Sequence, residues 1–386
     1  MVGAGKAAAA MAAAVENHWP AASPLEGLVI TRYGHGLPTA RIRVIEAGHP
    51  VPDESGEAAA RDILALAASL GEDDLLLALI SGGGSSLLAM PAPGVPMEDL
   101  KAVTRALLAS GARIEDMNTV RKHLSAIQGG RLAAATGASV LALIISDVTG
   151  DDPMHIASGP CAPDPTTYAQ ALEIFARFAV KAPAGVAAHL GRGAEGGLPE
   201  TPKPGDAVFA HVANRVIATA HQSLMAAAEY FRQHRITPMV LGDSVTGESS
   251  EVAKVFAAIA RQIRQHAHPA KPPVALISGG ETTVTLRGKG RGGRCTEFLL
   301  SLAIALEGVD GTWALACDTD GIDGSEDNAG AILAPDALER ANSAGLKPKE
   351  MLANNDGYGF FAALGGLVVT GPTRTNVNDY RVILVR

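Results

Sequence analysis

The sequence predicts an α/β protein with two domains. Short apolar runs typical of buried strands alternate with amphipathic segments of helical length along most of the chain. The 386 residues exceed one average domain. The segment 191–206 (GRGAEGGLPETPKPGD) has the glycine, proline and charge content of a linker. We therefore expect two α/β domains, 1–205 and 206–386, with a cleft between them.

The first half has the pattern of a mainly parallel sheet. Its expected strands are 27–31, 42–46, 75–80 and 139–147. Its expected helices are 6–15, 54–70, 97–110, 116–127 and 167–178. Each glycine-rich turn of this half follows a strand, at the edge where open α/β sheets bind ligands.

The second half resumes the alternation after the expected linker. Its expected strands are 208–219, 237–241, 313–317, 367–369 and 381–385, with a hairpin-like pair at 274–278 and 282–286. Its expected helices are 220–234, 248–266, 296–307, 336–344 and 358–364. No internal repeat connects the two halves.

The chain opens on a glycine turn that leads into a helix. Gly3, Gly5 and Ala8 fit the pattern G-x-G-x-x-G/A, which alone is a weak dinucleotide signal. Lys6 lies inside this turn and is more natural as a phosphate ligand than as a nicotinamide-site residue. The strand that should precede the turn is missing from the sequence. We therefore expect a gap or an exposed sheet edge beside residues 1–5.

Composition excludes several classes of protein. With 32 basic and 40 acidic residues the net charge is −8, which argues against a nucleic acid or an anionic membrane as partner. Three cysteines without a C-x-x-C pair exclude a disulfide scaffold and a structural zinc site, and a reducing cytoplasm is the expected compartment. No apolar run reaches transmembrane length. The sequence leaves the oligomeric state open, a homodimer included.

Two glycine-rich loops could bind phosphate groups. The first directly follows the expected strand 75–80 and consists of Ser81, Gly82, Gly83, Gly84, Ser85 and Ser86. The second follows the expected strand 274–278 and contains Gly279, Gly280, Glu281 and Thr282. Glycines let backbone amides approach an anion closely, and hydroxyl groups add donors. Arg294 ends a run of three cations and four glycines (288–294) before an expected helix, which would suit a polyphosphate. The alternatives are a flexible turn and a solvated loop.

A basic helix and two acidic loops complete the candidate residues. Arg121, Lys122 and Ser125 lie on adjacent faces of the expected helix 116–127, which equally fits a surface amphipathic helix. Asp147 and Asp151 follow one strand, and Asp318 and Asp320 follow another. Carboxylates at strand ends suit Mg²⁺, which uses one or two of them together with substrate phosphates. The alternative is that they are turn and helix-cap aspartates.

These motifs, in this order, resemble the class II glycerate kinases, the glycerate 2-kinase family that ends in a MOFRL domain. The matching stretches are GAGKAA (3–8), GHPVPDE (48–54), SGGGSS (81–86), NTVRKHLSAIQGGRLA (118–133), SDVTGDDPMHIASGP (146–160), SGGETTV (278–284), GRGGR (290–294) and NNDGYGFFAALGGLVVTGPTRTNVND (354–379). The resemblance implies a doubly wound, Rossmann-like first domain, a mixed-sheet α/β sandwich as MOFRL-type second domain, and an active site in the cleft between them.

The resemblance also implies a reaction, the ATP- and Mg²⁺-dependent phosphorylation of D-glycerate at its 2-hydroxyl. The family's functional lysine and arginine fall on Lys6 and Arg294, which would clamp the transferred phosphoryl group. The aspartates would hold Mg²⁺, and Arg121 and Lys122 the glycerate carboxylate or a phosphate. The chain departs from the family pattern at Gln128, where lysine is usual, and at Cys295, where asparagine is usual. Both departures spare the two cations.

Two other functions remain as alternatives. Some relatives are named hydroxypyruvate reductases, and an NAD(P)H-dependent reductase would use the opening glycine pattern. The expected strand 27–31 then runs into Arg32, which could accept NADP but leaves no acid for a ribose diol. A non-catalytic nucleotide sensor is the third alternative, which nothing in the sequence specifically supports.

Overall fold

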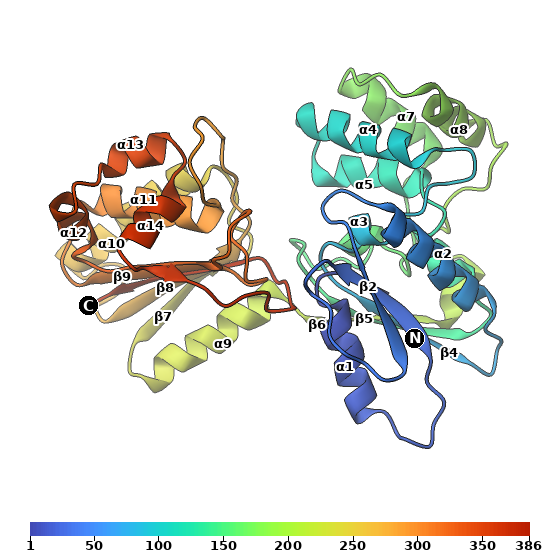
Figure 1. The fold of residues 1–386 in the computed structure, drawn as a ribbon, viewed down its shortest axis with the longest axis horizontal. Coiled ribbons are helices and arrows are strands. Elements are labelled where there is room, and N and C mark those ends of the chain that lie inside the picture. Colours follow the sequence, from blue (N-terminus) through green and yellow to red (C-terminus); the bar gives the residue numbers. More distant parts are fainter. The chain divides into compact units, whose positions relative to one another are not determined.

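The computed structural model describes residues 1–386, which form two compact units, Met1–Ile217 and Ala218–Arg386 (Figure 1). Each unit is built on a six-stranded sheet with helices packed against it. The predicted fold class, two α/β units of which one has a parallel and one a mixed sheet, is confirmed. The boundary between the two units lies after residue 217, later in the sequence than the expected 205/206. The reason is that the strand 212–218 belongs to the first sheet rather than to the second.

The first sheet has the strand order β3-β2-β1-β4-β5-β6, the arrangement of a doubly wound dinucleotide-binding fold. Its strands are β1 (Val2–Ala4), β2 (Gly27–Arg32), β3 (Ile42–Ala47), β4 (Leu75–Ile80), β5 (Ser139–Ile145) and β6 (Val212–Ala218). The pairs from β3 to β5 are parallel. The order reverses between β1 and β4, so a ligand crevice is expected at their carboxyl ends.

The expected gap at the start of the chain is wrong. Residues 2–4 are themselves the central strand, paired in parallel with β2 on one side and β4 on the other. Three residues suffice because the neighbours supply the hydrogen bonds on both sides and all three residues are buried. The sequence did not reveal this strand, since Val-Gly-Ala lacks the run of β-branched residues on which strand prediction depends.

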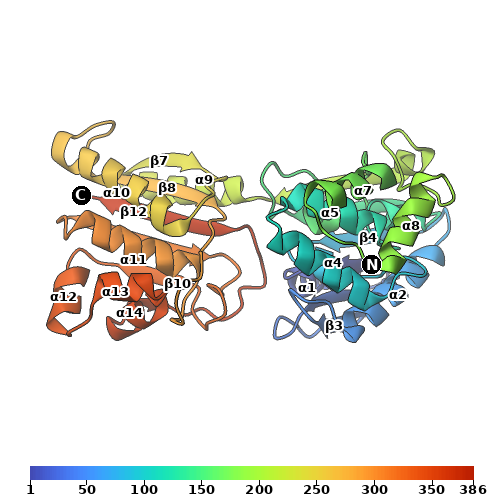
Figure 2. The ribbon, with the colours of Figure 1, turned by 90° about the horizontal axis from the view of Figure 1, so that it is seen from above.

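Helices cover both faces of the first sheet and form a further layer. These helices are α1 (Ala8–His18), α2 (Glu54–Ala68), α3 (Gly84–Leu87), α4 (Met97–Ala109), α5 (Ile114–His123), α6 (Arg131–Ala134), α7 (Tyr168–Arg177) and α8 (Ala184–Ala194). Helices α2, α3 and α6 share one core with the alternate side chains of β1, β2 and β4, and α1 lies against the opposite face. Helices α4, α5, α7 and α8 lie together (Figure 2) and share a separate core that includes Tyr168 and Phe175.

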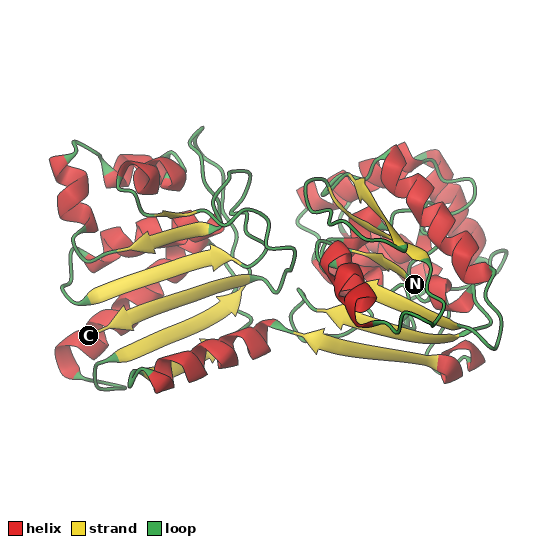
Figure 3. Cartoon of the chain, turned by 60° about the horizontal axis from the view of Figure 1, so that its bottom comes forward, coloured by secondary structure: helices red, strands yellow, loops and turns green.

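The second unit has a mixed sheet of order β11-β10-β9-β12-β8-β7 (Figure 3). Its strands are β7 (Thr237–Gly242), β8 (Val274–Gly280), β9 (Thr312–Asp318), β10 (Gly330–Leu333), β11 (Leu367–Val368) and β12 (Asp379–Val385). Its helices are α9 (Ala220–Gln233), α10 (Ser249–His266), α11 (Arg294–Leu306), α12 (Ala337–Ser343), α13 (Pro348–Ala353) and α14 (Gly357–Ala363). Helix α9 packs on one face of the sheet, and α10, α11, α12 and α14 share the core on the other.

Two further expectations are wrong. The pair 274–278 and 282–286 is not a hairpin, because β8 pairs with β7 and with the late strand β12, and Thr283 makes only an isolated bridge to Glu248. The segment 191–206 is not an interdomain linker. Helix α8 continues to Ala194, Glu200 bonds His123, and Thr201 is buried in the first unit. None of the helices combines the length and apolar character that crossing a bilayer requires.

Candidate active site

The carboxyl ends of β1 and β4 bring the first two glycine turns together. Lys6 follows β1, and its backbone N–H donates to Gly82 O at 2.8 Å. The backbone N–H of Ala7 donates to Ser81 Oγ at 3.0 Å. The turn 81–86, predicted to bind phosphate, therefore lies beside Lys6 at the point where the strand order reverses. We call Lys6 together with residues 81–86 the glycine-loop edge.

Two glycines allow the close approach of these turns. Gly5 has φ 138°, and a Cβ atom there would overlap Ser81 Oγ. Gly83 has φ 81°, and a Cβ atom on it would lie 2.9 Å from His49 Nε2 and 3.4 Å from Lys6 Cγ. A side chain at either position would combine an unfavourable left-handed backbone with a steric clash. The glycine spacing therefore brings the lysine against the serine-rich loop.

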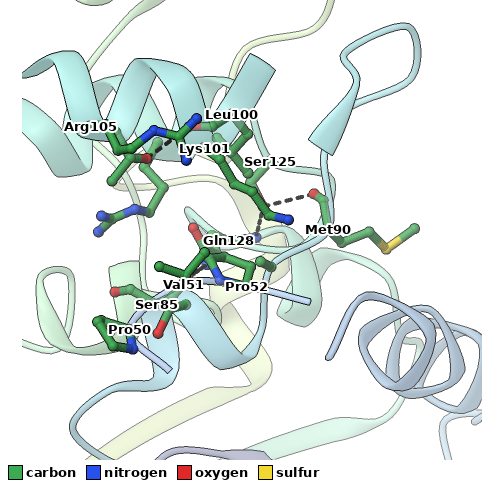
Figure 4. A pocket seen from close by; sticks show the side chains of 14 residues that line it. Pro50, Val51, Pro52, Ser85, Met90, Leu100, Lys101, Arg105, Ser125 and Gln128 are labelled. Atoms are coloured by element: carbon green, nitrogen blue, oxygen red, sulfur yellow. Dashed lines mark hydrogen bonds between the residues drawn. The ribbon is translucent and has the colours of Figure 1, made fainter. Parts of the chain in front are cut away.

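The cations predicted on the basic helix divide between two environments. Arg121 and Ser125 line a cavity of about 70 Å³ together with Ser85 and Ser86 of the glycine-loop edge (Figure 4). Lys122 lies outside this cavity, buried, with its Nζ 3.4 Å from Asp164 Oδ1. Helix α5 ends at His123, before Ser125, whose hydroxyl instead accepts the backbone N–H groups that follow it. Arg121 keeps its candidate role, whereas Lys122 belongs to a buried ion pair.

His123 is a structural histidine rather than a base exposed to a ligand. Its ring is fully buried, with Nδ1 2.8 Å from Thr119 O and Nε2 3.1 Å from Glu200 Oε2. Burial lowers its pKa, and the nearby carboxylates oppose this effect only in part. The histidine and Lys122 both interact with Asp164, so they belong to one buried polar cluster.

Asp147 and Asp151 follow β5, which neighbours β4, and are partly exposed. Asp151 has a left-handed backbone (φ 55°), and its N–H donates to Val148 O at 3.2 Å. A turn of this kind accounts for the backbone conformation. Both residues therefore lie in the loop after β5, at the same end of the sheet as Lys6 and residues 81–86. A metal role for them stays a prediction.

In the second unit, the register of the strands brings three residues side by side: the last residues of β8 and β9 and the first residue of β12. Strand β12 is antiparallel to both neighbours, so it begins where β8 and β9 end. Asp379, its first residue, is opposite Gly280 of β8 and Asp318 of β9. The predicted residues Gly280 and Asp318 are thereby joined by Asp379, which ends the matching stretch 354–379 but is not among the candidate site residues predicted from the sequence.

Arg294 is the centre of a cluster of carboxylates at this edge. Its Nε donates to Asp379 Oδ1 at 2.8 Å, Nη1 to Glu281 Oε1 at 2.5 Å and Nη2 to Asp318 Oδ2 at 2.7 Å. We call these four residues the Arg294 cluster. Burial alone would lower the pKa of Arg294, but the three carboxylates outweigh it and raise that pKa above its ordinary value. The guanidinium is therefore charged, and its orientation is held by hydrogen bonds to three carboxylates.

A second, fully buried arginine fixes the end of β8. Arg381 donates to Gly279 O at 3.2 Å, to Gly280 O at 3.4 Å and to Thr282 Oγ1 at 3.1 Å. It also forms a 2.6 Å ion pair with Asp379. The carbonyl and hydroxyl groups of the predicted loop 279–282 thus serve the protein's own arginine. Only the unusual placement of arginine in an apolar strand (RVILV, 381–385) could have signalled this residue in the sequence.

The acidic character of this edge fits a cation. Burial, and the charge of Asp320, raise the pKa of Asp318 to about 8. Crowded carboxylates of this kind favour a proton or a bound cation, which lowers their mutual repulsion. No group of three or more histidine, cysteine, aspartate or glutamate side chains is arranged as metal ligands. A magnesium role for Asp318 and Asp320 stays a prediction.

A cavity of about 250 Å³ lies beside the Arg294 cluster and extends to the glycine-rich loop 290–293. Arg294, Glu297, Thr282 and Asn355 contribute its polar lining. Burial raises the pKa of Glu297 to about 7. The predicted glycine–cation loop thus borders a cavity large enough for part of a ligand.

Comparisons with known proteins agree with this architecture. Residues 1–191 match the model of the "Domain of unknown function (DUF4147)", and residues 274–379 match that of the "MOFRL family". The chain is 53% identical to a protein of Agrobacterium vitis called "Putative hydroxypyruvate reductase", covering 100% of this chain and 86% of that one. It is 38% identical to the "Glycerate 2-kinase" of Pyrococcus horikoshii, covering 99% and 86% respectively.

A solved structure is similar over the whole chain. The crystal structure of glycerate kinase from Thermotoga maritima superposes with a TM-score of 0.89 at 39% identity, covering 100% of this chain and 91% of that one. Identity of this level over this coverage indicates common descent as well as a common fold.

Proposed function

The chain belongs to the glycerate 2-kinase family with a MOFRL domain, and from this premise we propose that it transfers a phosphoryl group from ATP to the 2-hydroxyl of D-glycerate, giving 2-phosphoglycerate. The observation that carries the proposal is the position of Lys6. It lies beside a serine- and glycine-rich loop at the reversal of the strand order, where doubly wound sheets bind phosphate-bearing ligands.

Each unit would contribute part of the phosphoryl-transfer chemistry. In the first unit, Lys6 and the loop 81–86 would neutralise and orient phosphate oxygens. In the second unit, Arg294 would supply the positive charge. Phosphoryl transfer depends mainly on such positioning and charge neutralisation. All three hydrogen bonds that Arg294 donates go to carboxylates, so contact with a phosphoryl oxygen would replace at least one of them.

The carboxylates would supply the metal site. Asp318 and Asp320 would hold Mg²⁺, with Asp147 and Asp151 as the candidates of the first unit. The ion would neutralise charge on the phosphate oxygens. Burial is the main cause of the raised pKa of Asp318 and the charge of Asp320 adds to it, so a bound cation would offset part of the cost of ionising this carboxyl.

A coupled assay tests the proposal. Purified protein is mixed with ATP, MgCl₂ and D-glycerate, and ADP release is followed while the product is identified by NMR. We expect ADP release that requires D-glycerate, stops with excess EDTA and resumes with Mg²⁺, with 2-phosphoglycerate as product. Formation of 3-phosphoglycerate would contradict the assignment of the 2-hydroxyl, and absence of ADP release would contradict the kinase assignment.

The name of the Agrobacterium relative gives a reason to test one alternative, reduction of hydroxypyruvate by NADH or NADPH. Strand β2 ends at Thr31 and Arg32 beside β1, and no acid stands there to bind a ribose diol. We therefore expect no oxidation of NADH or NADPH with hydroxypyruvate above background. Rapid oxidation of either cofactor without metal or ATP would replace the kinase proposal with the reductase.

A further inference from the structure

The start of helix α11 lies against a buried carboxylate of the chain itself. Asp323 accepts the backbone N–H of Cys295 on Oδ1 and that of Thr296 on Oδ2, both at 2.9 Å. Thr296 Oγ1 donates to the same Oδ2 at 2.8 Å. At a helix N-terminus these N–H groups bind either a capping side chain or an anion such as phosphate. An internal carboxylate therefore occupies a place that the sequence makes suitable for a polyphosphate.

The glycine-rich loop before α11 is also held by side chains of the chain itself. The backbone N–H groups of residues 287–291, except that of Gly290, donate over 2.7–3.2 Å to side-chain oxygens of Asn354, Asn355 and Asp356. A Cβ atom on Gly290 would lie 2.5 Å from Asp356 Cβ, so this glycine allows close packing within the protein. These amides serve the fold. A ligand would therefore meet the positive charge of this region through side chains, above all that of Arg294.

Asp323 is fully buried, and its surroundings hold it in place. It lies in the loop after β9, where its own N–H donates to Asn328 O at 2.7 Å. A Cβ atom on Gly293 would lie 2.3 Å from Asp323 Oδ1, and one on Gly324 would lie 3.0 Å from Gly292 O. The loop and the start of α11 therefore lie closer together than side chains at these glycines would allow. This contact fixes the first turn of the helix relative to the end of β9.

Arg294 is the first residue of this turn, and its side chain is bound to the same segment of the chain. Its Nη2 donates to Oδ2 of Asp318, the last residue of β9, at 2.7 Å. The segment 318–323 thus holds the side chain of the arginine through Asp318 and the turn that carries it through Asp323. A shift of the turn would change the direction of the guanidinium. Misplacing a catalytic group by about 1 Å can lower a rate by about 10²-fold.

We propose that Asp323 is a positioning residue for phosphoryl transfer, which caps α11 and thereby holds Arg294 in the orientation that meets the phosphoryl group. The inference rests on the proposed function, in which Arg294 makes that contact and Asp323 touches no substrate. A competing assignment is that the phosphate binds the N–H groups at the start of α11. The carboxylate would then compete with the phosphate, so its removal would strengthen nucleotide binding.

Steady-state kinetics of Asp323→Asn separates the two assignments. The asparagine has the size of the aspartate, but it has one acceptor atom fewer and no charge, so it holds the turn less firmly. We expect kcat to fall by about 10²-fold and the KM for ATP to stay within about threefold of the wild-type value. Asp323→Ala, which has no acceptor, should lose more activity. A lower KM for ATP with an unchanged kcat would place the phosphate at the helix N-terminus and overturn the proposal.

Gly293→Ala disturbs the same contact without removing the charge, and it replaces Asp323→Asn should that variant fail to fold. Gly293 has φ −127°, which alanine adopts, so the variant acts through the contact of its Cβ with Asp323. It should also lower kcat. The double variant should lose less than the product of the two single losses, because both changes affect one contact. Losses that multiply would show that the two residues act independently and would contradict the proposal.

Ser301→Ala is the matched control for a merely structural effect. Ser301 is buried on the same helix and donates to Ser250 O at 2.8 Å, away from the first turn. This variant should lower the melting temperature and leave kcat unchanged. If Ser301→Ala lowers kcat as much as Asp323→Asn at a similar loss of melting temperature, the role of Asp323 is structural and the inference is wrong.

An NMR measurement of the guanidinium needs no catalysis. Nε–H of Arg294 donates to Asp379 Oδ1 at 2.8 Å, so it should give a slowly exchanging signal, identified by its absence in Arg294→Lys. We expect this signal to shift or broaden in Asp323→Asn and to stay in place in Ser301→Ala. If it does so while the wild-type protein releases no ADP, the positioning stands and the kinase proposal fails. If the protein is an active kinase and Asp323→Asn has the wild-type kcat and signal, the kinase proposal stands and the inference is wrong.

Discussion

The buried ion pair between Lys122 and Asp164 allows a direct test of how the structure divides the basic helix. The family resemblance grouped Lys122 with Arg121 as a ligand of glycerate or a phosphate, whereas the structure buries it with Asp164 at 3.4 Å. The lysine side chain is 2% exposed and the aspartate side chain is not exposed at all. Lys122→Met keeps the alkyl chain that packs beside Gly129 and removes only the charge. The variant therefore isolates the contribution of the ammonium group.

The expected cost follows from leaving a buried carboxylate without its partner. Asp164 would keep hydrogen bonds from Thr166 N at 3.1 Å and Thr166 Oγ1 at 2.7 Å, but its Oδ2 already lacks a partner. Breaking a buried pair on one side costs about 3–5 kcal/mol. For a unit of this size, about 2–4 °C is lost per kcal/mol, so the melting temperature should fall by roughly 6–20 °C. The double variant Lys122→Met/Asp164→Asn should recover most of this loss, since it removes both charges.

Urea denaturation and calorimetry measure these changes, with an exposed ion pair of the same unit as control. Arg43 and Asp62 lie 3.0 Å apart with side chains 63% and 57% exposed. Arg43→Met should therefore cost less than about 1 kcal/mol. At a temperature where Lys122→Met is folded, its KM for D-glycerate should stay within about twofold of the wild-type value. The reason is that Lys122 pairs with Asp164, so its replacement removes no contact with the substrate. A tenfold higher KM with unchanged stability would refute the reasoning and return Lys122 to the substrate site.

Three further predictions concern the two candidate edges. Lys6→Ala should lower kcat by about 10²–10³-fold with a much smaller change in the KM for glycerate, because the contact strengthens in the transition state; a change confined to KM would contradict this. Arg294→Lys should also lose most activity, since one ammonium cannot serve the three carboxylates that the planar guanidinium joins; wild-type kinetics in this variant would contradict it. Burial raises the pKa of Glu297 from 4.5 to about 7, so the folded state keeps a proton that the unfolded chain releases. The free energy of unfolding should therefore fall as the pH rises from 4.5 to 7, by roughly 1–3 kcal/mol because solvent in the adjoining cavity screens part of the effect. Glu297→Gln should flatten this dependence in urea titrations at several pH values, and an unchanged slope would show that the carboxyl group titrates normally.

Much of the fold could be predicted from local pattern. The apolar run 75–80 is strand β4 at the expected residues, and the amphipathic segment 54–70 is α2 (Glu54–Ala68). These elements are long and periodic, so local pattern and tertiary environment favour the same structure. Prediction failed where the two differ. The alternating segment 282–286 looks like a strand, but β12 from the end of the chain occupies that side of β8 instead.

The first unit's candidate site could be predicted better than the second unit's, and the reason is the direction of the strands. In a parallel sheet every carboxyl end lies on one edge, so motifs that directly follow strands, such as Lys6 and residues 81–86, are brought together without further information. In the mixed sheet of the second unit, β12 runs antiparallel to β8 and β9. Its first residue therefore lies beside the carboxyl ends of these two strands. Asp379 therefore joins Arg294 and Asp318 although it precedes a strand and lies 85 residues from Arg294. Only the register of β12 against β8 and β9 determines this position, and register follows from burial of whole strand faces rather than from any short motif.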